Sequence, residues 1–241
     1  MKLFLLPHQD DEIFFIPHLL TEEQKLLVFL TCGVANGIQS AALFERTKEA
    51  RSIFEKHLAP LNSEVIWLGL DNLISEGELH KSINRNLEVA IIEIIKSRRF
   101  EITEVITTTF EGAHQDHDSA AVIARRIARE LQVETVEIST YPQWFSHIYS
   151  FKVLNPKSPD IEFRFNRLRS LLLALKLMRD YKTQRRTWLG LGLGVLWAYG
   201  FRPYMSSKPL AIGTINSCLY EFRGRRQQKE VLRSLAGPDN F

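Results

Sequence analysis

Five short strand-like runs recur in the first 140 residues and constrain the fold more than any other feature. They are residues 2–6, 26–31, 65–68, 104–108 and 133–138. Runs of this length, rich in Leu, Ile, Val and Phe, are typical of buried strands. The stretches between them have helical spacing, at residues 13–20, 40–57, 87–95 and 119–131. Strands that alternate with helices predict an α/β, Rossmann-like three-layer fold with a mostly parallel sheet.

Two polar turns follow the first and fourth of these runs. The first contains His8 and Asp11, three residues apart, and the second contains His117. In an open α/β sheet, ligands bind at the carboxyl ends of the strands, so the two turns can meet at one edge. Two histidines and one aspartate, with a further position for water, have the form of a catalytic zinc site. Taken alone, the first turn would more often be a surface histidine beside aspartates that cap a helix, and the second turn is what favours a metal site.

Both turns resemble those of the PIG-L / LmbE-like family of metal-dependent N-acetylglucosaminyl deacetylases. The family carries an H-P-D-D-E turn after the first strand and an H-P-D-H turn after the fourth; this chain has His8-Gln9-Asp10-Asp11-Glu12 and His114-Gln115-Asp116-His117. Gln9 and Gln115 therefore stand where the family usually has proline. These two departures concern loop rigidity and substrate fit more than the metal ligands.

Weaker matches extend the resemblance over most of residues 2–222. Arg46-Thr47-Lys48-Glu49 fits the family's R-x-x-E, and Gly69-Leu70-Asp71 resembles its G-x-x-D turn but is one residue shorter. Tyr181-Lys182-Thr183-Gln184 is similar to the Y-x-S-Q segment, and Glu221-Phe222 to the closing strand. The resemblance implies that Arg46 and Asp71 contact the sugar.

The residue types suit the hydrolysis of an amide, and the resemblance implies the same roles. His8, Asp11 and His117 would hold the metal, with Zn²⁺ preferred and Fe²⁺ also suited to such ligands. Asp10 cannot easily share the ion with its neighbour, so it is the expected general base. His114 would stabilise the oxyanion. Asp116 would orient His114 or raise its pKa.

The expected reaction is removal of the acetyl group from an N-acetylated amino sugar, and the expected partner is that sugar. Two alternatives remain. A relative could bind the sugar without turnover, or the chain could be another metal-dependent amidohydrolase. The metallo-β-lactamase signature H-x-H-x-D-H shares His114, Asp116 and His117, but Gly112 occupies its first histidine position. Glu12 would brace the first turn through a hydrogen bond.

Composition places the chain among globular proteins. The 241 residues are 45% hydrophobic and 24% charged, which suits one domain spanning 1–241. The net charge of +3 is too small to argue for nucleic acid. Cys32 and Cys218 are expected to be reduced thiols, and the start of the chain lacks a signal-peptide pattern. A cytoplasmic protein is expected.

The second half of the chain is less regular. Residues 145–154 have the pattern of an added edge strand, and 163–181 that of a basic amphipathic helix. Residues 188–201 are apolar or glycine, too few to cross a bilayer, which needs about 20 residues. They are expected to be a buried helix or loop, or else a surface flap that meets lipid or a lipid-linked substrate. A basic tail covers about 223–241. The oligomeric state cannot be read from these patterns.

Overall fold

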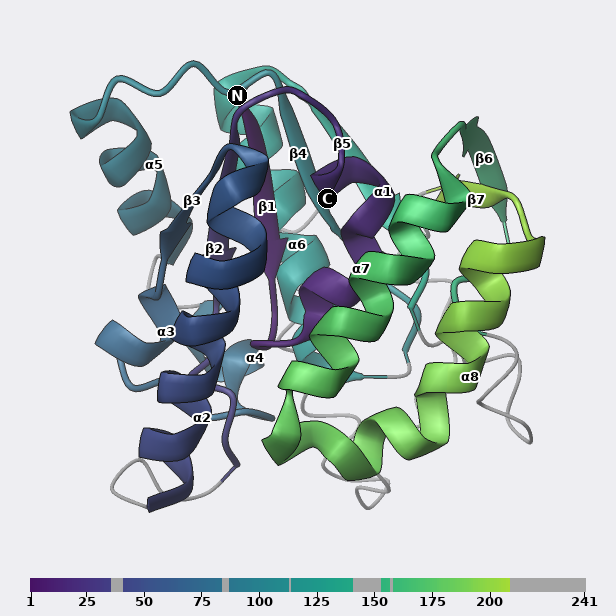
Figure 1. Cartoon of the computed structure of the whole chain (residues 1–241). Helices are drawn as coiled ribbons and strands as arrows, with labels where there is room; N and C mark the ends of the chain where they lie inside the picture. The colour runs from purple at the N-terminus through teal and green to yellow at the C-terminus, as the bar shows by residue number, and fades with distance from the viewer. Residues whose placement is uncertain (36–40, 84–86, 113, 141–152, 157, 209–241) are drawn as a thin grey trace.

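The structure is a computed structural model that describes residues 1–35, 41–83, 87–112, 114–140, 153–156 and 158–208 (Figure 1). The described residues form a seven-stranded sheet of order β3-β2-β1-β4-β5-β7-β6. Its strands are β1 (Lys2–Leu6), β2 (Lys25–Phe29), β3 (Ser63–Ile66), β4 (Glu104–Thr108), β5 (Glu134–Ile138), β6 (Pro159–Phe163) and β7 (Tyr204–Ser207). The first five are parallel, whereas β7 runs antiparallel to both β5 and β6. The predicted α/β fold with a mostly parallel sheet is confirmed.

Helices cover both faces of this sheet. They are α1 (Ile16–Leu19), α2 (Ala41–Ile53), α3 (Leu68–Asp71), α4 (Leu79–Ser82), α5 (Leu87–Ser97), α6 (Gln115–Leu131), α7 (Arg167–Asp180) and α8 (Arg185–Phe201). Shorter helical turns are η1 (Asp11–Phe15), η2 (Phe54–Leu58), η3 (Ala59–Leu61) and η6 (Lys182–Gln184). The predicted helix at 13–20 is therefore a 3₁₀ turn followed by a short α-helix, with Pro17 in the first turn of α1.

The sheet separates two apolar layers, because alternate side chains of a strand point to opposite faces. In β1, Leu3 and Leu5 join one apolar cluster while Phe4 and Leu6 join the other. Residues of α5 and α6 complete the first cluster, and residues of α2, α7 and α8 complete the second (Figure 1). The central strands β1 and β2 are buried on both faces, which explains why their sequences after the first lysine are apolar throughout rather than alternating.

Helix α6 begins earlier than its apolar periodicity predicts. The sequence suggests a start at Ser119, but the helix starts at Gln115 and His114 is the N-cap. The Nδ1 atom of His114 accepts the backbone N–H of Asp116. Asp118 lies inside the first turn, where its carboxylate accepts the N–H groups of Glu111 and Gly112. Polar residues fill this buried first turn, so it carries no apolar signal.

The second half also differs from the sequence expectation. The described edge strand is β6 at 159–163; of the predicted strand 145–154, residues 145–152 lie outside the described residues and 153–154 form a turn. The predicted helix at 163–181 is α7, which is shorter because Asn166 caps it by accepting the N–H of Arg169. Cys32 is a buried free thiol, and Cys218 lies outside the described residues.

The apolar stretch 188–201 forms most of α8, a continuous helix despite its glycines. A side chain at Gly192 would meet the Met178 sulfur of α7 at 3.3 Å, so the small residue allows the two helices to approach. The Tyr199 and Tyr204 hydroxyls donate to the carbonyls of Ile13 and Phe14 in η1. These bonds tie the C-terminal elements to the turn that follows β1. No helix among the described residues is long and apolar enough to span a membrane.

Candidate active site and metal centre

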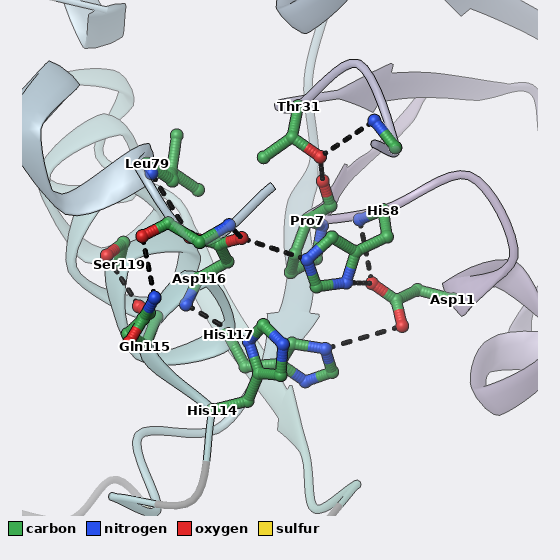
Figure 2. Close-up of polar contacts among 12 residues, drawn as sticks. Pro7, His8, Asp11, Thr31, Leu79, His114, Gln115, Asp116, His117 and Ser119 are labelled. Atoms are coloured by element: carbon green, nitrogen blue, oxygen red, sulfur yellow. Dashed lines mark hydrogen bonds and ion pairs between the residues drawn. The ribbon is translucent and has the colours of Figure 1, made fainter. Parts of the chain in front are cut away.

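The two polar turns meet at the carboxyl ends of adjacent parallel strands. Strands β1 and β4 pair directly, with Leu5 opposite Thr107, so the segments that follow them emerge side by side. Figure 2 shows His8 and Asp11 from the first turn facing His114, Asp116 and His117 at the start of α6. Residues more than a hundred positions apart thus form one buried cluster.

Three side chains of this cluster have the arrangement of metal ligands. His8, Asp11 and His117 each offer a ligand atom, and these atoms all lie within 4.8 Å of one another. Nδ1 of His8 is 3.1 Å from one Asp11 carboxylate oxygen, and Nε2 of His117 is 3.4 Å from the other. The three residues predicted as ligands are therefore brought together, with their nitrogens directed at one carboxylate.

The other ring nitrogen of each histidine is held by a buried partner. Nε2 of His8 lies 3.0 Å from the Asp116 carboxylate, and Nδ1 of His117 lies 2.8 Å from the Thr140 hydroxyl. Such partners fix the ring orientation and leave the opposite nitrogen for a metal ion. Two imidazoles and one carboxylate form a donor set that suits Zn²⁺ and also Fe²⁺, so the residues fit the predicted ion.

Asp116 has a different partner from the one expected. The sequence predicts that its carboxylate orients His114, but the carboxylate contacts His8 and also accepts the N–H groups of Gly77 and Leu79. The contact to His114 runs through the Asp116 backbone N–H instead. Burial raises the pKa of Asp116, but the hydrogen bond and charge of His8 outweigh this and lower it to about 2. Asp116 is thus a permanent anion behind His8.

The electrostatics of the ligands favour a cation. Burial raises the pKa of Asp11, but the charges of His117 and His8 together hold it well below the ordinary range. Burial favours the neutral ring of His117 and lowers its pKa to about 4. For His8, burial is outweighed by Asp11 and Glu76, which raise the pKa well above the usual value. A neutral ring is a metal ligand, so binding an ion to His8 displaces a proton.

Asp10, the expected general base, lies beside this cluster and is held by Arg46. The Arg46 guanidinium is 2.9 Å from one Asp10 oxygen, and both side chains are buried. Burial raises the pKa of Asp10, and so does the negative charge of Asp11, whereas the positive charge of Arg46 lowers it. The net effect is a pKa of about 6. A carboxylate with such a pKa can both accept and return a proton near neutral pH.

Arg46 is also anchored from the segment between α7 and α8. It donates to the Thr183 hydroxyl at 3.1 Å and lies over the ring of Tyr181, 5.1 Å from its centre. The Tyr181 hydroxyl donates to Glu12, which is fully buried as the expected brace of the first turn. Glu49, one helical turn after Arg46, accepts the N–H groups of residues 182 and 183. The weak R-x-x-E and Y-x-S-Q matches are therefore in contact with each other.

Of the two residues expected to contact the sugar, Arg46 touches another predicted site residue. Arg46 contacts the site through Asp10, whereas Asp71 is exposed at the end of α3.

The sequence analysis did not identify Glu76 as a site residue. Its carboxylate forms a second candidate ligand group with His8 and His114, with all ligand atoms within 4.8 Å. Its signal in the sequence is faint: an acid next to Gly77, in the loop after the third strand. Gly77 has a positive φ of 83° and donates its N–H to Asp116, which brings this loop to the site.

His114 is half-buried and lies against the rings of both histidine ligands. Its ring centre lies 4.7 Å from that of His8 and 4.9 Å from that of His117. Its Nδ1 is the N-cap acceptor for the backbone N–H of Asp116, which fixes the ring. This position suits the predicted contact with an oxyanion.

Comparison with known families agrees with this geometry. The family model described as PIG-L, GlcNAc-PI de-N-acetylase, matches residues 3–142. The chain belongs to the PIG-L family. The matched region of this PIG-L chain contains all the predicted site residues, including both histidine turns. Comparison with curated protein sequences found no match.

Solved structures share the fold of this PIG-L chain at low sequence identity. The zinc-inhibited form of teicoplanin deacetylase has a TM-score of 0.59 at 15% identity, covering 85% of this chain and 95% of that one. A40926 pseudoaglycone deacetylase has a TM-score of 0.55 at 18% identity, covering 85% and 94%. N,N'-diacetylchitobiose deacetylase from Pyrococcus horikoshii has a TM-score of 0.58 at 14% identity, covering 92% and 88%.

Proposed function

We propose that the protein is a metal-dependent hydrolase that removes the acetyl group from an N-acetylated amino sugar. The observation that carries this proposal is the buried group of His8, Asp11 and His117 with Asp10 beside it. Membership of the PIG-L family supports the reaction class. The fold shared with structures described as teicoplanin, A40926 pseudoaglycone and diacetylchitobiose deacetylases supports the substrate class.

The chemistry divides between the ion and the side chains. His8, Asp11 and His117 would hold a divalent ion, for which Zn²⁺ is our preference and Fe²⁺ an alternative, and this ion would supply a Lewis acid for the attack of water on the amide. Asp10 would accept a proton from the attacking water and return it to the departing amine. Arg46 holds the Asp10 carboxylate in position through their 2.9 Å contact. His114 stabilises the negative charge that develops on the carbonyl oxygen.

Sugar recognition is proposed for the acidic and basic groups around this centre. Arg46 and Asp71 remain predicted sugar contacts, and we add Glu76 because its carboxylate lies close to ligand atoms of His8 and His114. A carboxylate there can accept hydrogen bonds from sugar hydroxyls. Exchange of Glu76 for Gln would raise KM more than it lowers kcat if the contact is to the sugar.

The test measures metal content and acetate release together. Protein purified without added metal is analysed for zinc and iron, and acetate release is measured on a panel of N-acetylglucosaminides, including lipid-linked ones. We expect about one ion per chain and a fall in kcat of about 10²–10⁴-fold in Asp10→Asn, with metal content unchanged. Asp160→Asn, on the exposed edge strand β6, is the matched control and should behave as wild type.

Three outcomes would contradict the proposal in different ways. Absence of metal even after reconstitution would mean that the two turns do not form an ion site. Full activity in Asp10→Asn would remove Asp10 as the base. Sugar binding without turnover on any N-acetylated sugar would identify a binding protein instead of an enzyme.

A further inference from the structure

Helix α8 exposes a row of large apolar side chains. Leu189, Leu193, Trp197 and Phe201 are 83%, 63%, 44% and 71% exposed. They recur every fourth residue, so they lie along one side of the helix. Soluble proteins rarely leave such a row uncovered, and a contiguous apolar patch usually marks an interaction site.

The row borders a groove between α7 and α8, which lie side by side (Figure 1). The groove has a volume of about 450 Å³ and is lined by Met178, Arg185, Trp188, Leu189, Gly192, Leu193 and Leu196. On α7, Leu171 and Met178 face α8 at Gly200 and Gly192. Leu175 follows Leu171 by one helical turn and is exposed, as are Leu168 and Leu172. The apolar surface therefore extends across both helices.

The charges in and around this helix pair are almost all positive. Between residues 164 and 208 the basic residues are Arg164, Arg167, Arg169, Lys176, Arg179, Lys182, Arg185, Arg186, Arg202 and Lys208, and the acidic residue is Asp180. The Asp180 carboxylate is already paired with Lys56, His57 and Arg179. Arg186 is exposed and precedes Leu193 by two helical turns, so it lies at one end of the apolar row.

We propose that the α7–α8 face docks on an anionic membrane surface. A helix that carries Leu, Trp and Phe on one side with arginines at its ends has the composition of an interfacial helix, which lies in the plane of the membrane. The apolar row enters the boundary between headgroups and acyl chains, and Arg185 and Arg186 contact lipid phosphates. The positive charge selects a lipid surface over an uncharged protein partner, because it is attracted to anionic leaflets. The proposal does not depend on the proposed deacetylase activity.

The test is sedimentation of the full chain with vesicles, in low salt. Vesicles of phosphatidylcholine alone are compared with vesicles of phosphatidylcholine and phosphatidylglycerol at a ratio of about 3:1. We expect binding to the anionic vesicles, weakened by salt as for any surface electrostatic attraction. The paired change Arg185→Glu with Arg186→Glu should weaken binding at least about tenfold, as for loss and reversal of lipid-facing charges.

Leu193→Glu should weaken vesicle binding by a similar factor, because it places a carboxylate in the apolar row. Val89→Glu is the matched control: Val89 is 46% exposed on α5, which covers the opposite face of the sheet. Both sites are exposed, so both variants should fold, which circular dichroism checks. Unchanged binding in Leu193→Glu, or absence of wild-type binding, would overturn the proposal. So would a wild-type dimer that Leu193→Glu dissociates without any vesicle binding, because a second copy would then cover this face.

Discussion

The two histidines of the candidate metal centre are oriented from outside by single buried groups. Asp116 holds the Nε2 side of His8, and Thr140 holds the Nδ1 side of His117. The backbone N–H of Thr140 donates to Glu111, so this residue is fixed independently of its hydroxyl. The hydroxyl of Thr140 can therefore be removed without moving the strand end that carries it.

Thr140→Val should weaken metal binding about 10–100-fold, as is usual when a partner behind a histidine ligand is lost. The side chain keeps its shape, but His117 loses the group that sets its tautomer. Competition with a chelator of known affinity measures the effect. Thr103→Val is the control, since the Thr103 hydroxyl makes an exposed bond to the Met1 carbonyl at the far end of the sheet. Equal affinity in both variants would show that Thr140 does not orient the ligand.

For single residues of the site, the sequence predicts which side chains come together but not which hydrogen bonds they form. Spacing on the two turns is sufficient to propose His8, Asp11 and His117 as one group, and the structure places them together. The partner of Asp116 depends on where α6 begins, which its polar first turn conceals. Glu76 reaches the cluster through a loop whose path is set by bonds from Gly77 and Leu79 to Asp116. Such long-range contacts have no local signal.

Two helical glycines, Gly69 and Gly190, differ in the space available for a side chain. A Cβ at Gly69 in α3 would lie 2.3 Å from the Thr31 backbone nitrogen and 2.4 Å from the Leu30 carbonyl carbon. Backbone atoms cannot yield as a flexible side chain can. By contrast, a Cβ at Gly190 in α8 would meet nothing within 4 Å among the described residues.

Gly69→Ala should therefore destabilise the protein by more than about 3 kcal/mol, at the severe end of single substitutions. Gly190→Ala should stabilise it by about 0.5–1 kcal/mol, because alanine loses less conformational freedom in a helix. Urea unfolding of both variants gives the comparison. A Gly69→Ala protein as stable as wild type would mean that α3 does not pack this closely on the loop after β2.

Strands with a clear run of apolar residues are predicted well from the sequence. Elements whose position depends on contacts with other helices or strands are not. The five parallel strands follow from their apolar runs, within two residues at each end. Helix α8 is one of the forms expected for 188–201, and Gly192 and Gly200 lie close to Met178 and Leu171 of α7. Strands β6 and β7 pair antiparallel with a register shift, and nothing local in their sequences indicates that they extend the sheet.

Across the whole molecule, the C-terminal elements close over the N-terminal turn. The Tyr181, Tyr199 and Tyr204 hydroxyls donate to Glu12 and to backbone carbonyls of η1. The same layer buries His18 of α1, whose ring centre lies 4.3 Å from that of Phe163 in β6 and 5.6 Å from that of Tyr204 in β7. The protonation of the His18 ring therefore depends on whether this layer stays packed over α1.

The stability of the whole fold should depend on the protonation of His18. Burial lowers its pKa to about 3, with a further decrease from Lys2, and its ring nitrogens have no hydrogen-bond partner among the described residues. The unfolded chain binds a proton on this ring below about pH 6.5, whereas the folded chain does not until about pH 3. Protons therefore favour unfolding throughout that window, and stability is lost as the pH falls below about 6.5.

The replacement His18→Leu should remove this dependence. Each pH unit within the window is worth about 1.4 kcal/mol, so between pH 7 and pH 5 wild type should lose about 2 kcal/mol more unfolding free energy than the variant. Urea unfolding at the two pH values measures the difference, and other titrating groups cancel because they are common to both proteins. Equal losses in the two proteins would mean that His18 is protonated or hydrated in the folded state, and that the layer over α1 is open to water.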